Sequence, residues 1–232
     1  MTRLTIAIPT FRRPQDLKRA VIGVLEQAGE LVGGSSAEAR EPEGDAVGAA
    51  DVDGGAGRGV SDVEVLVIDN DAQGTGREAA LAAAADAGVP VRSSAEAPEE
   101  PGGVGLRYVV EERPGVAAVR NRALDETGGR DLLVFIDDDE EPEPGWLAAL
   151  VGLWASTGCQ AVAGPVIPVY EVEPEAWVRQ GEFFVRRTWP TGTVRPVAAS
   201  NCLLLDLGFV RRAGLRFDEA FGATGGEDTL FT

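Results

Sequence analysis

Three consecutive aspartates, Asp137, Asp138 and Asp139, follow directly after an apolar stretch at Leu132–Ile136. Adjacent carboxylates repel one another, so a folded protein keeps such a run most easily beside a counter-charge. Hard oxygen ligands at the end of a strand suit Mg²⁺ or Mn²⁺, the ions that commonly accompany phosphate-bearing substrates. Runs of charge are also commonly just solvated. The three aspartates therefore indicate either a divalent-metal site or an acidic surface loop.

Histidine is absent from the chain, and its absence excludes several kinds of catalytic site. Triads with imidazole as the base and zinc centres with histidine ligands are ruled out, so acid–base chemistry falls to carboxylates. The two cysteines, Cys159 and Cys202, are too few for a disulfide framework and fit a reducing compartment.

The 232 residues carry a net charge of −17, which bears on the class of partner. A general nucleic-acid-binding protein needs a basic face, so no nucleic-acid partner is expected. No apolar stretch is long enough to span a membrane. The first residues enter a strand-like run without the apolar core of a signal peptide, so we expect a cytoplasmic protein.

Strand-like and helix-like stretches alternate along the chain and position the aspartates. Such alternation predicts an α/β fold with a mainly parallel central sheet and helices on both faces. Ligands of these sheets bind beyond the carboxyl ends of the strands, where Asp69 and the three aspartates fall. Strands are expected at 4–8, 63–68, 106–110 and 132–136, and helices at 14–28, 77–87, 116–126 and 146–156.

Two segments, residues 29–62 and 93–105, differ from the rest of the chain. They are rich in Gly, Ala, Ser and acids and contain almost no large apolar side chain. Structureless loops this long are unusual in a compact domain. We therefore expect poorly ordered insertions within a single domain that spans residues 1–232.

Four large aromatic residues lie close together in the second half of the chain: Trp177, Phe183, Phe184 and Trp189. Large apolar side chains are usually buried, so the favoured interpretation is a part of the core. The alternative is an apolar platform for a substrate.

Five motifs, in their order and spacing, resemble the family-2 glycosyltransferases, which have the GT-A fold. The resemblance covers nearly the whole chain outside the two insertions. Three short segments, at 164–166, 177 and 199–201, look like the branch with glucosyltransferases of succinoglycan-type exopolysaccharide assembly. The five motifs are residues 8–14 (IPTFRRP), 67–70 (VIDN), 115–123 (GVAAVRNRA), 135–139 (FIDDD) and 225–228 (GGED).

The resemblance implies a binding site for the nucleotide. Asp69 would accept a hydrogen bond from uracil, and Asp138 would hold the ribose. Arg120 and Asn121 would face the nucleotide and steady the aspartate loop. The residues that would line the nucleotide pocket are Pro9, Thr10, Phe11 and Arg12.

Several of these positions also have plain structural interpretations. Thr10 could cap the following helix, and Asp69 could form a turn. Arg120 and Asn121 could lie on a solvated helix face. The resemblance favours a nucleotide site because it places all of them at one edge of the sheet.

The resemblance also implies the chemistry of transfer. Asp139 would ligate Mn²⁺ or Mg²⁺ with support from Asp137, and the metal would neutralise the departing diphosphate. Asp228, which follows Glu227, would take the proton of the acceptor hydroxyl. One base and one direct displacement predict inversion at the anomeric carbon. The structural alternative for Glu227 and Asp228 is a pair of acids at a helix N-terminus.

The implied function is transfer of a hexose from a UDP-sugar in cell-surface or exopolysaccharide synthesis. The acceptor would be a saccharide or a lipid-linked saccharide, met by peripheral association with the inner face of the membrane. Family members continue past the Glu-Asp pair, whereas this chain ends four residues after Asp228. A C-terminally truncated GT-A domain is therefore expected, and the alternative function is a catalytically silent nucleotide-sugar-binding or scaffold protein.

Two other enzyme classes fit single motifs but not their surroundings. Residues 74–79 match the dinucleotide-binding pattern GxGxxA, yet residues 69–73 separate the first glycine from the preceding strand. A phosphatase with an aspartate nucleophile would need Thr or Val where Glu141 stands. Neither class is expected.

Overall fold

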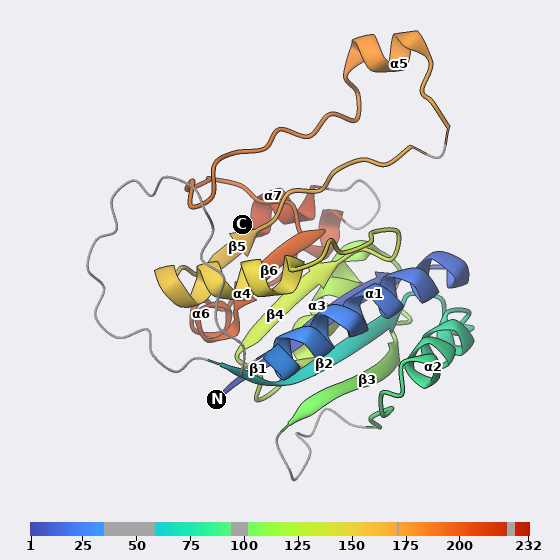
Figure 1. Ribbon diagram of the computed structural model, residues 1–232, viewed down its shortest axis with the longest axis vertical. Helices are drawn as coiled ribbons and strands as arrows, with labels where there is room; N and C mark the ends of the chain where they lie inside the picture. The colour runs from blue at the N-terminus through green and yellow to red at the C-terminus, as the bar shows by residue number, and fades with distance from the viewer. Residues whose placement is uncertain (35–58, 94–101, 171, 222–225) are drawn as a thin grey trace.

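A single mixed sheet of six strands, in the order β3-β2-β1-β4-β6-β5, forms the centre of the molecule (Figure 1). In the computed structural model, residues 1–34, 59–93, 102–170, 172–221 and 226–232 are described. Strands β1 to β4 are mutually parallel, and β6 runs antiparallel to both β4 and β5. The mainly parallel sheet expected from the sequence is confirmed. The strands are β1 (Thr2–Thr10), β2 (Val60–Asp69), β3 (Gly103–Val110), β4 (Leu132–Ile136), β5 (Ala161–Ala163) and β6 (Cys202–Asp206).

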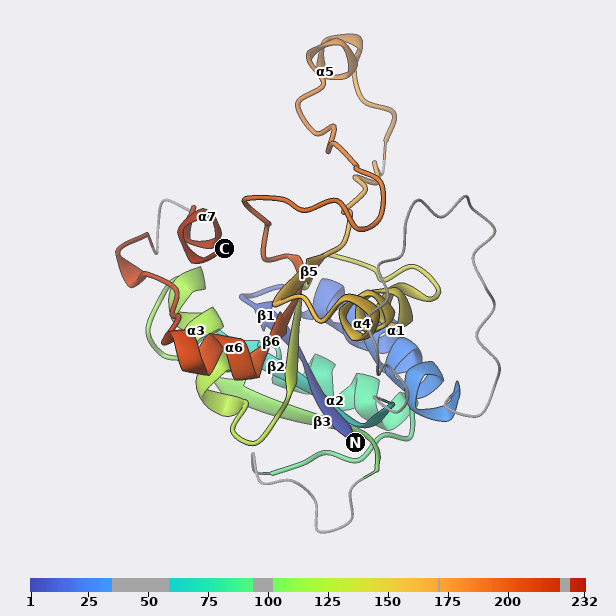
Figure 2. The ribbon, with the colours of Figure 1, turned by 90° about the vertical axis from the view of Figure 1, so that its left-hand side faces the viewer.

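Helices cover both faces of the sheet (Figure 2). Helices α1, α2 and α4 pack on one face, and α3, α6 and α7 pack on the other. A short 3₁₀ turn, η2 (Glu219–Phe221), precedes α7. The helices are α1 (Pro14–Gly33), α2 (Arg77–Asp86), α3 (Val116–Glu126), α4 (Trp146–Thr157), α5 (Ala176–Gly181), α6 (Leu207–Ala213) and α7 (Glu227–Phe231).

The two-residue period of the strands divides the core between these faces. In β2, Val63, Val65 and Val67 point toward α1 and α2, whereas Leu66 and Ile68 point toward α3. All five are fully buried. Apolar residues on both faces of a strand are what a parallel sheet covered by helices requires.

The two segments expected to be insertions are shorter than the sequence indicated. Helix α1 continues through Gly33, β2 already begins at Val60, and β3 begins at Gly103. The residues between these elements, 35–58 and 94–101, lie outside the described part of the chain.

Asp62, which the sequence analysis placed in the first insertion, is a buried member of β2. Its carboxylate accepts a hydrogen bond of 2.8 Å from Arg92 and pairs with Arg130. Next to it, the buried Glu64 receives two hydrogen bonds from the guanidinium of Arg107, at 3.0 and 3.1 Å. An ionic cluster therefore anchors the amino-terminal half of β2 against β3 and the end of α3.

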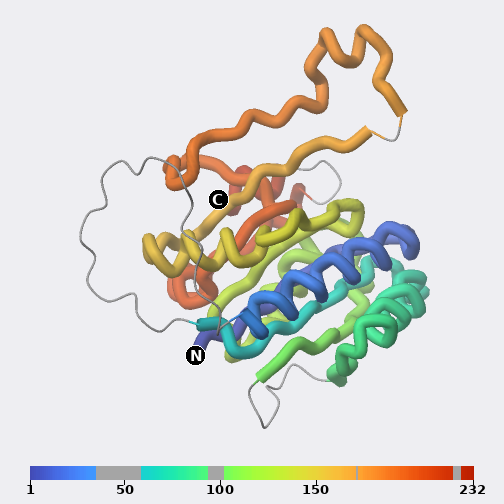
Figure 3. Tube along the Cα trace, in the orientation of Figure 1, coloured from blue at the N-terminus to red at the C-terminus, as the bar shows by residue number. Residues whose placement is uncertain are grey.

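The chain between β5 and β6 leaves the body of the molecule as a long excursion that carries α5 at its tip (Figures 1 and 3). Trp177, Phe183, Phe184 and Trp189 all lie on this excursion and are exposed. The interpretation of these aromatics as core is therefore wrong. No helix in the described residues is both long and apolar enough to cross a bilayer.

Candidate functional site

The ends of β1 and β4 meet through a hydrogen bond between Thr10 and Asp138. The Thr10 Oγ1 donates to Asp138 Oδ2 at 2.7 Å, and both side chains are buried. The two strands are parallel neighbours, with Ala7 opposite Phe135, so their carboxyl ends must emerge side by side. Thr10 does not cap α1, whose N-cap position is Arg13. The pair joins the first and fourth motifs of the sequence.

Arg13 lies over the aspartate loop and supplies a positive charge. Its Nη1 is 3.3 Å from Asp138 Oδ1 and 2.7 Å from Asp139 Oδ2. These carboxylates, Asp138 foremost, raise the pKa of the Arg13 guanidinium. The sequence motifs had indicated no role for Arg13. The available signal was its place just beyond a strand whose parallel neighbour ends in acids.

Arg120 joins the aspartate loop to the beginning of α7. It forms a buried ion pair with Glu227, and its Nη2 is 3.9 Å from Asp137 Oδ1. Glu227 is thus committed to Arg120. Asp228 is only partly buried, and its Oδ1 accepts a hydrogen bond of 2.8 Å from the Thr229 amide. Of the two acids, Asp228 is the one with a carboxylate open to solvent.

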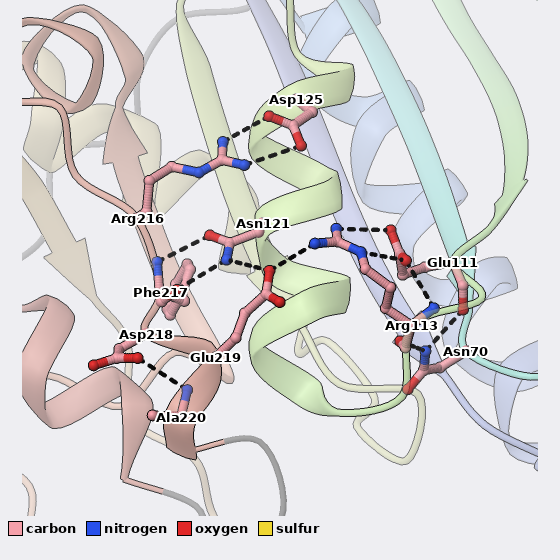
Figure 4. Close-up of polar contacts among 10 residues, drawn as sticks. All are labelled: Asn70, Glu111, Arg113, Asn121, Asp125, Arg216, Phe217, Asp218, Glu219 and Ala220. Carbon is pink, nitrogen blue, oxygen red and sulfur yellow. Dashed lines mark hydrogen bonds and ion pairs between the residues drawn. The ribbon is translucent and has the colours of Figure 1, made fainter.

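Helix α7 reaches this place because the preceding segment is clamped onto α3 (Figure 4). The Asn121 side chain donates to the carbonyl of Phe217 at 2.8 Å and accepts from its amide at 2.9 Å. The Phe217 ring stacks on Phe231 of α7, with ring centroids 4.0 Å apart. Both polar groups of the Asn121 side chain are therefore used in bracing, a contact that the sequence analysis did not foresee.

Two further ionic contacts strengthen this clamp. Glu219 accepts a hydrogen bond of 2.8 Å from Arg113, which also binds Glu111 (Figure 4). Arg216 makes paired hydrogen bonds of 2.6 and 3.0 Å to Asp125. The segment before α7 is therefore attached both to α3 and to the loop after β3.

Asp69, at the end of β2, is fully buried and organises the loop that follows. Its Oδ1 accepts from the Asp71 amide at 2.9 Å, and its Oδ2 accepts from the Gly76 amide at 2.7 Å and the Tyr108 hydroxyl at 2.6 Å. Burial and the nearby Asp69 carboxylate raise the pKa of Tyr108. For a nucleotide base to contact Asp69 directly, one of these three hydrogen-bond donors would have to move away from the carboxylate.

The loop beside Asp69 touches the Thr10 end of β1. The Asn70 amide donates to the Thr10 carbonyl at 2.8 Å. A Cβ on Gly76 would lie 3.0 Å from Asp69 Oδ2 and 3.3 Å from Thr10 Cγ2, so only glycine fits without a shift. Arg12 binds Asp71 through its Nε at 3.2 Å. The ends of β1 and β2 therefore form one continuous polar edge.

The remaining residues expected in the nucleotide pocket differ in their exposure. Phe11 is 52% exposed and its ring packs against the guanidinium of Arg12, at 4.9 Å from the ring centroid. Pro9 is half-buried within β1. Phe11 and Arg12 thus offer accessible surface beside the Thr10–Asp138 pair, whereas Asp69 and Asn121 do not.

Glu140 is an acid at this edge to which the sequence analysis assigned no role. It accepts hydrogen bonds from Asn201 at 2.7 Å and from the Asp137 amide at 3.4 Å. Burial, followed by repulsion from Asp137, raises the pKa of Glu140 to about 7. The acidic run therefore extends by one residue into the site and is tied to the start of β6.

The edge suits a divalent cation in the chemistry of its donors. Burial raises the pKa of Asp137 and Asp138, and neighbouring carboxylates add to the effect against the opposing charges of Arg120 and Arg13. A bound cation would relieve this repulsion between the carboxylates. In the structure, the guanidinium of Arg13 supplies a positive charge beside Asp139. Among the described residues, no three acidic or cysteine side chains converge enough to hold a metal alone. Further oxygen ligands, such as those of a diphosphate, would be needed.

Comparison with known proteins gives a family and a curated relative. The sequence matches the family described as "Glycosyl transferase family 2" over residues 56–206. The succinoglycan biosynthesis protein ExoM of Rhizobium meliloti (strain 1021) is 36% identical over 132 residues, which are 54% of this chain and 40% of that protein. This chain therefore spans well under two thirds of its relative's length.

Solved structures share the fold. The mannosyltransferase PcManGT from Pyrobaculum calidifontis, solved with GDP-Man and Mn²⁺, superposes with a TM-score of 0.60 at 18% identity, over 97% of this chain and 49% of that one. S. aureus TarS, solved with UDP, superposes with a TM-score of 0.55 at 13% identity, over 100% of this chain and 54% of that one. These likenesses confirm the GT-A fold expected from the sequence.

Proposed function

Because this chain belongs to glycosyl transferase family 2, we propose that it binds a nucleotide sugar at the carboxyl edge of its sheet and transfers the sugar with inversion. The observation that carries this proposal is the meeting of Thr10, Arg13, the three aspartates and Arg120–Glu227 at that edge. Thr10 and Asp138 are 128 positions apart in the sequence, and Arg120 and Glu227 are 107 apart. A solvated acidic loop would not need such partners.

The donor in this proposal is a UDP-hexose. TarS was solved with UDP and PcManGT with GDP-Man, so proteins of this fold bind nucleotides of both kinds. Exposed Phe11 and Arg12 offer the nucleotide an apolar face and a positive charge, and Asp138 is assigned to the ribose. Asp69 is assigned to uracil, and its complete burial means that the loop at Gly76 must open for direct contact.

A divalent cation, Mn²⁺ or Mg²⁺, is assigned to Asp139 with support from Asp137. Asp139 is the exposed member of the acidic run, with 55% of its side chain accessible, so a diphosphate can complete the coordination. When bound, the metal would neutralise negative charge on the departing diphosphate. Arg13 now pairs with Asp139 and would have to release it, after which its guanidinium is free to bind a phosphate oxygen.

The general base in this proposal is Asp228. Its neighbour Glu227 is held by Arg120, so the orientation of α7 is set and the partly exposed Asp228 carboxylate is left for the acceptor. The acceptor hydroxyl gives its proton to Asp228 while its oxygen attacks the anomeric carbon from the face opposite the diphosphate. A single displacement of this kind inverts the anomeric configuration.

The acceptor in this proposal is a saccharide or lipid-linked saccharide of exopolysaccharide synthesis, at the cytoplasmic face of the membrane. The name of the relative, a succinoglycan biosynthesis protein, supports the type of pathway. The partial coverage of that relative leaves the sugar and the linkage open.

The test is a calorimetric titration of UDP and of GDP into the purified chain, first with Mn²⁺ and then with EDTA. Metal-dependent binding of UDP is the expected result. Preference for GDP would overturn the assignment of uracil as the nucleotide base of the donor. Turnover is then measured with UDP-hexoses and saccharide acceptors. Binding without turnover would identify the catalytically silent alternative.

A further inference from the structure

Residues 164–170 and 172–201, here called the β5–β6 arm, carry most of the exposed large apolar side chains of the described chain. The arm leaves the sheet after β5, carries α5 at its tip and returns to β6 (Figures 1 and 3). At its root, the Gly164 amide donates to the Cys202 carbonyl at 2.9 Å, so the two ends are tied together. The body of the arm extends away from the rest of the molecule in both views (Figures 1 and 2).

The aromatic side chains of the arm face solvent. Trp177 is 63% exposed, Phe183 65%, Phe184 56% and Trp189 48%. Their ring contacts are with other residues of the arm: Trp177 with Phe183, at 5.9 Å between centroids, and Phe184 with Tyr170, at 6.3 Å. Exposed large apolar side chains gathered on one segment of a folded protein indicate a binding surface, whereas single exposed apolar residues need no explanation.

The returning half of the arm is also basic, in contrast to the rest of the protein. Residues 183–199 contain three arginines and no acid, within a chain whose net charge is −17. Every residue from 181 to 197 is exposed. Arg186 and Arg187 form no ion pair with any described residue, and Arg195 packs over the Trp189 ring, 3.8 Å from its centroid.

We propose that residues 183–199 dock onto an anionic lipid surface. Aromatic rings settle at the level of the lipid headgroups, and arginines beside them pair with anionic headgroups while their stems stay in apolar surroundings. The acidic remainder of the protein is repelled by the same surface, so it would be held with the arm as the contact. An uncharged saccharide would gain no electrostatic attraction from the arginines, so their positive charge favours an anionic lipid surface as the partner.

The position of the arm determines where a bound lipid surface would lie relative to the candidate site. Cys202 pairs with Ile136 in the sheet, so the arm leaves from the edge that carries Asp137. Close to the root, the Ala198 amide donates to Thr232 Oγ1 at 3.1 Å, next to the end of α7. A lipid surface under the arm would therefore lie on the side of the molecule that holds Asp228; this step rests on the proposed function, whereas the lipid contact itself does not.

The test is co-sedimentation of the purified chain with vesicles, one set of phosphatidylcholine alone and one with an equal part of phosphatidylglycerol. Binding to the anionic vesicles only, weakened by added salt, is the expected result. Brominated lipids supply a second readout. The fluorescence of W177F, which keeps the exposed Trp189, should be quenched, whereas that of W177F/W189F, which keeps only Trp146 and Trp154 on α4, should not.

A matched pair of variants separates local charge from net charge. Arg186→Gln with Arg187→Gln should weaken partition onto anionic vesicles about 30-fold, from about fivefold for each arginine at the surface. Lys18→Gln with Arg19→Gln removes the same charge from α1 and should leave partition unchanged. UDP binding without vesicles should be equal in all variants, so failure of the lipid contact is distinguishable from failure of the proposed function.

Several results would overturn the proposal. These are no binding to anionic vesicles, equal binding to neutral vesicles, or equal loss in both double variants. Sedimentation velocity without lipid tests the remaining alternative. If the protein does not bind vesicles but self-associates, and R186Q/R187Q abolishes that self-association, the arm would be assigned to contact with a second copy of the chain.

Discussion

Arg120 and Glu227, 107 positions apart in the sequence, form a buried ion pair that joins α3 to the first residue of α7. The same guanidinium lies 3.9 Å from Asp137, so one arginine contacts both the aspartate loop and α7. The pair explains why the two acids of α7 differ. In the proposed mechanism, Glu227 is a positioning residue and Asp228 is available for an acceptor.

Replacing Glu227 by Gln should destabilise the protein because it leaves the buried Arg120 charge with only the more distant Asp137, at 3.9 Å, as an anionic partner. The expected loss in free energy of unfolding is about 3–5 kcal/mol, measured by urea denaturation. The control is Asp125→Asn, which disrupts the exposed pair with Arg216 and should cost less than about 1 kcal/mol. Equal losses of unfolding free energy in the two variants would show that the buried ion pair stabilises the fold no more than the exposed one.

Asp139→Ala should abolish the metal-dependent part of UDP binding, because it removes the proposed direct ligand. Its side chain is largely accessible, so the melting temperature should change little. Titration calorimetry with Mn²⁺ and with EDTA makes the measurement, and Glu143→Ala, an exposed acid nearby, is the control. Unchanged Mn²⁺-dependent affinity in Asp139→Ala would remove this residue from the metal site.

Asp228→Asn should leave donor affinity intact and lower transfer by about 10²–10⁴-fold, the usual contribution of a general base. Initial rates with a UDP-hexose and an acceptor provide the measurement. Asp218→Asn, at an exposed acid in the segment before α7, should retain full activity. Wild-type turnover by the Asp228 variant would clear that residue of the role.

Gly76→Ala tests the close packing between the loop after β2 and the end of β1. The new Cβ would lie 2.9 Å from Leu17 Cδ2 and 3.0 Å from Asp69 Oδ2, so unfolding should become easier by about 1–3 kcal/mol. UDP affinity should also fall, because Asp69 and Thr10 must shift. Gly29→Ala on α1 meets nothing within 4 Å and should instead stabilise the protein by about 0.5–1 kcal/mol.

Glu64→Gln tests the ionic cluster at the other end of β2, away from the candidate site. Arg107 would keep its buried charge with a weakened partner, and a loss of about 3–5 kcal/mol in unfolding free energy is expected. UDP affinity should not change. Glu26→Gln, an exposed acid on α1, serves as the control, and a loss of nucleotide binding in Glu64→Gln alone would contradict the separation of the two regions.

The sequence by itself determined the framework and the place of the acidic run. Apolar stretches such as Leu132–Ile136, alternating with helical periodicity, can bury both faces only in a mainly parallel sheet. The carboxyl ends of such strands share one edge, so Asp69 and Asp138 had to lie there. These conclusions depend on local pattern, which the order of residues contains directly.

Only the tertiary structure decided which partner each polar or aromatic side chain has. Asp62 looked like part of an acidic insertion, whereas its ion pair with Arg130, from the loop before β4, places it in the core. Asn121 is committed to Phe217, and Trp177 is exposed because no described element covers it. Residue type sets what a side chain can bind, whereas its actual partner depends on contacts between positions that are distant in the chain.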